Sequence, residues 1–300
     1  AFSPRQSVSS SYGRTANAYD ANYTPAGSSG GTASGVASSF GVAGLGSDTG
    51  NSIRGPSSHL ALFGIRSTIG LTSRDGVIPL SFDRDIAGPM ARTVEDGARL
   101  FNVVAGFDEA DTLTLPNKRE EDYRSFLNKD GLVGKRLGVF RSLVDHDDAD
   151  AKIKALFYKA IEDLEAAGAT IVDPVEIKDF ELLSDTMPSC ARFRYDVGQY
   201  FKTLNNPPLL DVNTVLETGQ YAPETKGGLE YFSAYPLDVA PDDREVSCPT
   251  WPNDEKRNEL LANTIAAMDS SNVDALIFPT WSNPPAHIDR ADEEYKGDNN

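Results

Sequence analysis

Two serine sites lie in one glycine-rich stretch of the chain, and a serine in such a turn can act as a nucleophile. Residues 27–57 contain nine of the 25 glycines, with Ser28 and Ser29 in a first turn and Ser52 in a second. Glycine lets backbone N–H groups approach a ligand closely. Those groups can then stabilise the negative charge that develops on an attacked carbonyl oxygen. A serine in such a turn can therefore attack a ligand while the neighbouring N–H groups hold the developing charge.

This stretch resembles the signature of the amidase signature family, which reads roughly GGSSGG, an alanine-rich helix and then GTDxGGSIRxP. The resemblance implies that Ser52 is the acyl-forming nucleophile and that Ser28, held in a cis peptide, relays a proton. It also implies that the backbone N–H groups of Thr49, Gly50 and Asn51, together with that of Ser52, form an oxyanion hole. Asn51 departs from the family, which usually has glycine there, but asparagine tolerates a positive φ better than most residues.

Three further residues near the two serines are expected to support them. Ser29 is expected to hydrogen-bond within its turn rather than to react. Asp48 and Arg54 flank Ser52 and are expected to form a structural ion pair or to bind the backbone, since a guanidinium has a fixed fork of donors. A later loop, residues 70–92, resembles the segment that follows the nucleophile in the family. The matching residues are Gly70, Ser73, Gly76, Pro79, Asp85, Gly88, Pro89 and Arg92.

A conventional serine hydrolase is the main alternative chemistry. Residues 27–31 fit G-x-S-x-G, which would make Ser29 the nucleophile. That motif needs a buried strand directly before it, and a triad needs a histidine. No such strand is evident, and the three histidines, His59, His146 and His287, give no clear base. His59 is expected to be a helix-end or packing residue. A phosphate-binding loop is disfavoured because the motif GxxxxGK[ST] is absent.

The general base is the missing part of this motif. In the family a lysine takes the proton through the bridging serine, yet this chain has no lysine before Lys118. Lys118 and Lys135 lie in charged or strand-start contexts that suit solvent exposure. We therefore expect a chain incomplete at both ends, with the catalytic lysine just upstream of Ala1. The mechanism requires neither a metal nor an organic cofactor.

The composition limits the classes of partner. The chain has 300 residues, 39 % of them hydrophobic, and a net charge of −17, of which −1 falls in residues 1–110 and −16 in the remainder. An acidic surface argues against direct nucleic-acid binding, which needs basic patches. No apolar run reaches the length that crosses a bilayer. We expect a soluble protein, with the cytoplasm favoured. Cys190 and Cys248 lack metal-ligand spacing, and buried free thiols are favoured over a disulfide.

Hydrophobic periodicity and turn residues predict alternating strands and helices. A short helix is expected over 32–40 and a strand over 42–46, and Thr93 with Asp96 should cap a further helix. The later part predicts strands over 135–141, 169–172 and 275–279 and helices over 151–167 and 255–268. This order favours an α/β arrangement with helices on a sheet. The family resemblance implies a mixed central β-sheet covered by helices on both faces. We expect one domain over 1–300, in which the proline-rich residues 180–250 form a cover or substrate entrance.

The function that the resemblance implies is hydrolysis of a carboxylic amide to a carboxylate and an amine or ammonia. The expected partner is a small-molecule amide substrate, and the sequence leaves a homo-oligomer open. One alternative is the amide-hydrolysing subunit of a tRNA-dependent amidotransferase, which works inside a complex. Another is a catalytically inactive homologue that serves as a scaffold.

Overall fold

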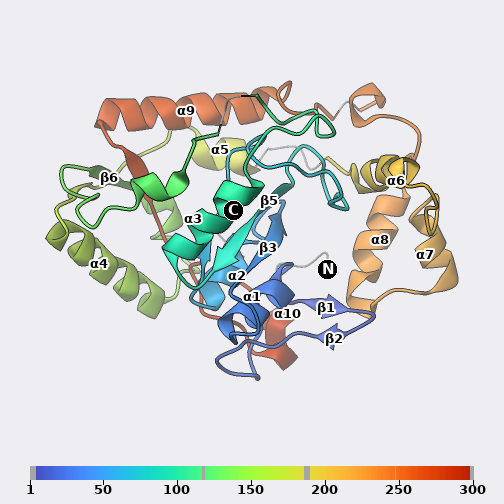
Figure 1. The fold of residues 1–300 in the computed structure, drawn as a ribbon, viewed down its shortest axis with the longest axis horizontal. Coiled ribbons are helices and arrows are strands. Elements are labelled where there is room, and N and C mark those ends of the chain that lie inside the picture. The colour runs from blue at the N-terminus through green and yellow to red at the C-terminus, as the bar shows by residue number, and fades with distance from the viewer. Residues whose placement is uncertain (1–4, 117–118, 186–189, 247, 298–300) are drawn as a thin grey trace.

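Two three-stranded sheets form the framework of the fold (Figure 1). The computed structural model describes residues 5–116, 119–185, 190–246 and 248–297. In the antiparallel sheet, β5 (Ile86–Ala91) lies between β3 (Ala43–Asp48) and β4 (Phe63–Gly64). In the parallel sheet, β6 (Arg136–Val139) lies between β7 (Thr170–Val172) and β8 (Ala275–Ile277). A short hairpin joins β1 (Val8–Ser9) to β2 (Gly13–Arg14).

The α/β class is therefore confirmed, and within the described ranges the strands form separate sheets rather than one continuous central sheet. The α-helices are α1 (Gly30–Ala37), α2 (Arg54–His59), α3 (Val94–Val104), α4 (Ala151–Ala166), α5 (Phe180–Asp185), α6 (Phe193–Thr203), α7 (Asn213–Thr218), α8 (Lys226–Ser233), α9 (Glu255–Ser271) and α10 (Ala291–Glu294). Short 3₁₀ helices cover Tyr123–Phe126, Arg141–Leu143, Pro223–Thr225, Pro241–Asp243 and Ile288–Arg290. No helix in the described ranges is long and apolar enough to cross a membrane.

The helix termini follow the capping residues in the sequence. The Thr93 hydroxyl accepts a hydrogen bond from the Asp96 N–H and starts α3, as predicted. The Asp150 carboxylate caps α4 in the same way. The β6–α4–β7 unit joins two parallel strands, which confirms the strand–helix–strand order expected from residues 135–172. The apolar residues of α4 are only partly covered, since none of its residues is buried and Leu156 is 67 % exposed.

Two apolar clusters of buried residues lie in different parts of the fold. One packs α1 and α2 against β5 through Ala33, Ile53, Leu60 and Met90. The other lies within residues 180–250, where α6 and α8 pack through Phe193, Val197, Phe201, Val212 and Leu229. In Figure 1 this second helical group (α6, α7 and α8) stands beside the antiparallel sheet. The first cluster fixes the position of the turn that precedes α2.

The expectation of free thiols is wrong, because Cys190 and Cys248 form a disulfide with Cα atoms 5.6 Å apart. Polar contacts bring the two segments together. Arg192 Nη1 donates to the Thr250 hydroxyl at 3.1 Å, and Arg244 Nη1 donates to the Ala191 carbonyl at 2.8 Å. Sequence spacing alone carried no information on this pairing. The disulfide ties the start of α6 to the segment that precedes α9.

Removing this disulfide should destabilise the protein without touching the serine turns. Its cysteines are 58 residues apart, so the chain-entropy treatment gives about 4 kcal/mol of stabilisation. Urea unfolding of the oxidised protein should show a higher midpoint than unfolding with dithiothreitol. The double variant Cys190→Ala with Cys248→Ala should match the reduced protein and no longer respond to dithiothreitol. Equal midpoints for the oxidised and reduced protein would contradict the stabilising role.

Candidate active site

The first serine turn connects residue 26 to α1 and is held by Ser7. The Gly27–Ser28 peptide bond is cis, as the resemblance implied. The Ser7 hydroxyl donates toward the carbonyls of Ala26 (3.1 Å) and Ser28 (3.2 Å) and accepts from the Gly30 N–H at 3.1 Å. A Cβ added at Gly30 would lie 2.4 Å from the Ser7 Oγ, so the glycine permits this close approach. Sequence reasoning missed Ser7, which lies in a polar segment with no periodic signal.

The two serine turns meet through Ser29. Its backbone N–H donates to the Ser52 carbonyl at 3.1 Å. Its hydroxyl donates to the Ser47 carbonyl and accepts from the Ser47 N–H, both at 3.2 Å. The Ser29 side chain therefore ties the first turn to β3, whereas the sequence predicted a hydrogen bond within its own turn. The structure thus brings Ser28, Ser29 and Ser52 into one region.

The second turn, residues 49–52, is built around the buried carboxylate of Asp48. This carboxylate accepts from the backbone N–H groups of Ile53 (3.1 Å) and Arg54 (3.3 Å). The Arg54 guanidinium donates to both Asp48 oxygens, at 3.1 and 3.2 Å, and to the Gly50 carbonyl at 2.5 Å. The pair closes the turn from both ends, as the structural interpretation of Asp48 and Arg54 anticipated.

The Asp48 carboxylate is also paired with a second arginine, Arg66, and the sequence did not predict this contact. The Arg66 Nη1 lies 3.0 Å from the Asp48 Oδ1 and also donates to the Asp48 carbonyl, while its Nη2 donates to the Arg84 carbonyl at 3.0 Å. No spacing rule links Arg66 to Asp48 across a separation of 18 residues. The fold alone brings them together, because β4 and β3 flank the same strand.

The charges around Asp48 set its ionisation. Burial alone would raise its pKa, but the hydrogen bonds and charge of Arg54, with the charge of Arg66, hold the pKa below its usual value. Burial lowers the pKa of Arg66, and the Asp48 charge opposes that shift. Asp48 is therefore ionised at neutral pH and stabilises the turn as a carboxylate.

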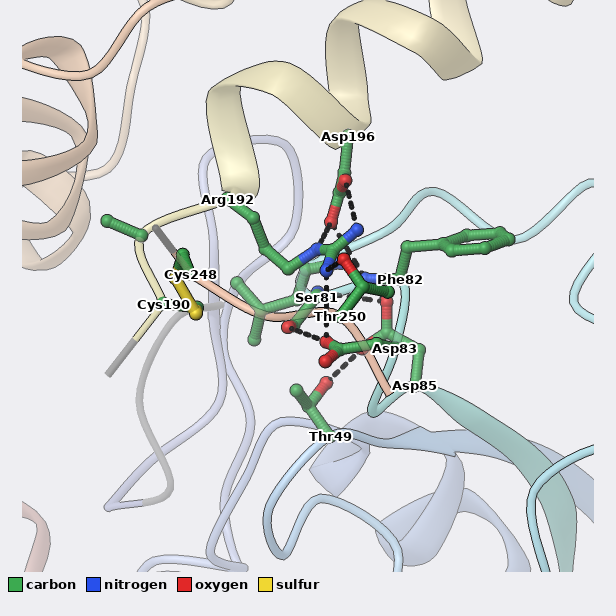
Figure 2. Close-up of polar contacts among 12 residues, drawn as sticks. Thr49, Ser81, Phe82, Asp83, Asp85, Cys190, Arg192, Asp196, Cys248 and Thr250 are labelled. Carbon is green, nitrogen blue, oxygen red and sulfur yellow. Dashed lines mark hydrogen bonds and ion pairs between the residues drawn. A yellow bond between two sulfur atoms is a disulfide. The ribbon is translucent and has the colours of Figure 1, made fainter. Parts of the chain in front are cut away.

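Thr49 is the residue of this turn that is held by Asp85. The Thr49 hydroxyl donates to the Asp85 carboxylate, which also accepts from the backbone N–H groups of Leu80 (2.9 Å) and Ser81 (3.0 Å) (Figure 2). Burial raises the pKa of Asp85, and its hydrogen bond with Thr49 opposes that shift. Asp85 thus joins the second serine turn to the loop of residues 78–85. The sequence marked Asp85 only as part of a matching loop.

Asn51 fills a buried position within the second turn. It is 2 % exposed, and neither of its amide atoms has a hydrogen-bond partner among the described residues. A Cβ added at Gly55 would lie 2.3 Å from the Asn51 Nδ2 and 2.6 Å from the Trp281 ring. Gly55 therefore leaves the space that the asparagine side chain occupies. In the described part of the chain, no hydrogen bond uses the backbone N–H groups of residues 49–52.

A cavity of about 300 Å³ opens at the two serine turns. Ser28 and Thr49 lie in its wall, whereas Gly50, Asn51 and Ser52 are not among its lining residues. The full lining consists of Ser28, Ser47, Thr49, Ile78, Pro79, Leu80, Asp85, Phe193 and Thr225. Phe193 and Thr225 come from the proline-rich region 180–250. We call this space the reaction cavity.

Among the described residues, no histidine or lysine lines the reaction cavity. His59 is the last residue of α2, with its ring 4.5 Å from the Trp281 ring, and burial lowers its pKa to about 4. It is a packing residue, as expected. Lys135 is exposed and lies 3.6 Å from the Asp274 carboxylate, and Lys118 falls outside the described residues. Among the described residues, no group of three or more His, Cys, Asp or Glu side chains could hold a metal ion.

Comparison with known proteins identifies the family of the chain. The amidase family model matches residues 4–300. The chain is 35 % identical over 225 residues to a subunit of the glutamyl-tRNA(Gln) amidotransferase of Acinetobacter baumannii, covering 73 % of this chain and 46 % of that protein. The chain thus spans about half the length of the curated relatives it matches.

Two solved structures extend the comparison. Native peptide amidase of Stenotrophomonas maltophilia superposes with a TM-score of 0.76 at 28 % identity, over 98 % of this chain and 63 % of that one. The corresponding glutamyl-tRNA(Gln) amidotransferase subunit of Thermotoga maritima gives a TM-score of 0.65 at 26 % identity, over 95 % and 56 % of the two chains. Both similarities cover nearly all of this chain.

Proposed function

Because the chain belongs to the amidase family, we propose that it hydrolyses a carboxylic amide through a serine acyl-enzyme. The observation that carries the proposal is the reaction cavity, whose wall holds Ser28 of the cis turn and Thr49 of the turn that ends in Ser52. The hydrogen bond from the Ser29 N–H to the Ser52 carbonyl, at 3.1 Å, supports placing the two serines in one site.

In this mechanism Ser52 Oγ attacks the amide carbonyl carbon and passes its proton to Ser28. The backbone N–H groups of residues 49–52 stabilise the oxyanion, since no other hydrogen bond uses them within the described residues. Collapse of the tetrahedral intermediate breaks the C–N bond while Ser28 protonates the leaving amine or ammonia. Water then attacks the ester by the reverse path and releases the carboxylate.

The relay requires a base behind Ser28, because a serine hydroxyl is too weak an acid to attack an amide unaided. The family resemblance implies a neutral lysine, whose pKa burial would lower. Residues 1–117 contain no lysine, so we place this group outside that range of the intact protein. We propose no metal or organic cofactor for the reaction.

The surroundings of the cavity suggest the kind of partner. Phe193 and Thr225 line the cavity, which supports a role for residues 180–250 as the substrate entrance of a single domain. We propose a small-molecule amide as substrate and no direct contact with nucleic acid, given the net charge of −17. We place the protein in solution, in the cytoplasm, with a homo-oligomer left open.

Ser28 and Ser29 are neighbours in one turn and give a matched test of the relay. Ser28→Ala in the intact protein should lower kcat for amide hydrolysis by roughly 10²–10⁴-fold, the range that positioned proton transfer contributes. Ser29→Ala should lower it far less, because Ser29 only ties the turn to Ser47. Amine or ammonia release measures both. A loss confined to Ser29→Ala would favour the G-x-S-x-G assignment and reject the relay.

A second candidate is favoured by the similarity to the amidotransferase subunits. In that case the protein would hydrolyse glutamine inside a complex and pass ammonia to another protein of that complex. Glutaminase activity that appears only when partner subunits are added would select this candidate. Turnover of other amides by the protein alone would select the independent amidase.

A further inference from the structure

A second cavity, of about 330 Å³, lies next to the reaction cavity. The two cavities share Pro79 and Asp85 in their walls, so they abut along the loop of residues 78–85. Helix α6 forms the opposite wall of the second cavity with Tyr195, Gln199 and Tyr200. The loop of residues 78–85 therefore borders both the space at the serines and this second space. We call this space the side cavity.

The walls of the side cavity are fixed by buried polar contacts. Arg74 Nε donates to the Asp111 carboxylate at 2.8 Å, and its guanidinium lies 4.1 Å from the centre of the Phe82 ring. The Phe82 N–H donates to the Asp196 carboxylate at 2.8 Å, and Arg192 Nε donates to the same carboxylate at 2.6 Å (Figure 2). These bonds join the loop to α6, so the cavity exists before any ligand enters. A preformed pocket of this size is typical of a binding site for a small molecule.

The lining of the side cavity is mainly apolar and aromatic. Val77, Pro79 and Phe82 lie on the loop side and two tyrosines, Tyr195 and Tyr200, on the helix side. Gln199 and Thr203 add neutral hydrogen-bonding groups. Such a surface suits an aromatic or aliphatic group with at most a neutral polar tip.

The charged groups of the side cavity disfavour anions. Its wall contains four carboxylates, Asp75, Asp85, Asp111 and Asp196, and one cation, Arg74. Arg74 is already paired with Asp111, and Asp196 is paired with Arg192. Among the described residues of the wall, no cation therefore remains to receive a carboxylate ligand. A ligand carboxylate would lose its hydration beside like charges, whereas a neutral or cationic group would not.

We propose that the side cavity binds the end of the amide substrate remote from the scissile bond, and that this end is aromatic or aliphatic and neutral or cationic. The proposal rests on the amidase function and specifies its substrate class. It predicts discrimination against amides with a distal carboxylate, a class that includes glutamine. Gln199, Tyr200 and Thr203 would then be specificity-determining residues.

The test uses amides that share one scissile group in the intact protein. Acetamide occupies only the reaction cavity, whereas 4-phenylbutyramide also reaches the side cavity. A para-carboxylate and a para-aminomethyl derivative of the phenyl amide vary its distal charge. We expect kcat/KM for the carboxylate to be at least about 10-fold below those of the neutral and cationic amides, as expected from burying an unpaired charge.

Filling the side cavity should separate the long substrate from the short one. Gln199→Trp and, independently, Thr203→Trp should lower kcat/KM for 4-phenylbutyramide by roughly 10-fold or more and change that for acetamide less than about twofold. The control Leu261→Trp adds the same bulk on α9, where Leu261 is 56 % exposed and lines neither cavity. It should change neither value. Thermal unfolding confirms that each variant is folded.

Direct binding gives a readout that is independent of turnover. Isothermal titration with 4-phenylbutanol should show binding to the wild type and to Leu261→Trp and none to Gln199→Trp. The side-cavity proposal would be overturned if the tryptophan variants lost kcat/KM equally for both amides, or if the carboxylate derivative were turned over as well as the neutral one. Unchanged 4-phenylbutanol binding in folded Gln199→Trp would also overturn it. Selective 4-phenylbutanol binding without turnover of any amide would overturn the amidase function instead and uphold the cavity's ligand class.

Discussion

Replacing Ser52 with alanine should reduce amide turnover by the intact protein at least about 10⁴-fold, because loss of a nucleophile removes the covalent route and leaves only binding and the oxyanion hole. The turn itself should persist. Its shape depends on the Asp48 carboxylate and on the Ser52 backbone carbonyl, which accepts from the Ser29 N–H at 3.1 Å. KM should therefore change much less than kcat. Steady-state release of amine or ammonia measures both.

The matched control for this variant is Ser58→Ala, which removes an exposed hydroxyl from α2, the helix that follows the Ser52 turn. Its kcat should stay within about twofold of the wild type, as expected of a surface substitution. Near-normal turnover by Ser52→Ala would exclude Ser52 as the nucleophile, even if other serines in the turn proved important.

Replacing Asp48 with asparagine should produce the largest loss of stability among the site variants. Asp48 is fully buried between two arginines whose side chains are 27 % and 24 % exposed. Breaking a buried ion pair costs about 3–5 kcal/mol, and the lower end applies here because water still reaches both guanidinium groups. Urea unfolding should therefore show a decrease of about 3 kcal/mol in the free energy of unfolding, by the same principle. Glu95→Gln breaks an exposed pair with Arg99 and should cost less than about 1 kcal/mol.

The lowered pKa of Asp48 also predicts a pH dependence. The native pKa lies below the unfolded value of 3.8, so the ionised carboxylate stabilises the folded state above that value. This stability is lost as the pH falls through 3.8 toward the native pKa. The difference in unfolding free energy between wild type and Asp48→Asn should therefore shrink in acid and be constant near neutrality. A difference that grows with acidity would contradict the ionised state of Asp48.

Local patterns in the sequence predicted many of the secondary-structure elements and the ion pair beside the second serine turn. The cap formed by Thr93 and Asp96, the strand after Lys135 and the helix after Asp150 follow from side chains that act on their own backbone. The signature pattern located the cis peptide at Ser28 and the Asp48–Arg54 pair. These features depend on residues close in sequence, where spacing carries structural information.

Features that depend on distant segments could not be predicted in the same way. Ser7, Arg66 and Asp85 hold the serine turns from 18 to 36 residues away, and nothing in their local sequence marks their partners. The Cys190–Cys248 disulfide joins segments that lie 58 residues apart in the sequence. The side cavity needs the loop of residues 78–85 and α6 together. Such contacts follow from the tertiary arrangement rather than from periodicity.

Identification of the residue that carries the acyl group tests the central claim most directly. The intact protein would be treated with a fluorophosphonate, digested and analysed by tandem mass spectrometry. The amidase account predicts one adduct, on Ser52, absent from Ser52→Ala and retained in Ser29→Ala. An adduct on Ser29, or labelling that persists in Ser52→Ala, would contradict the account.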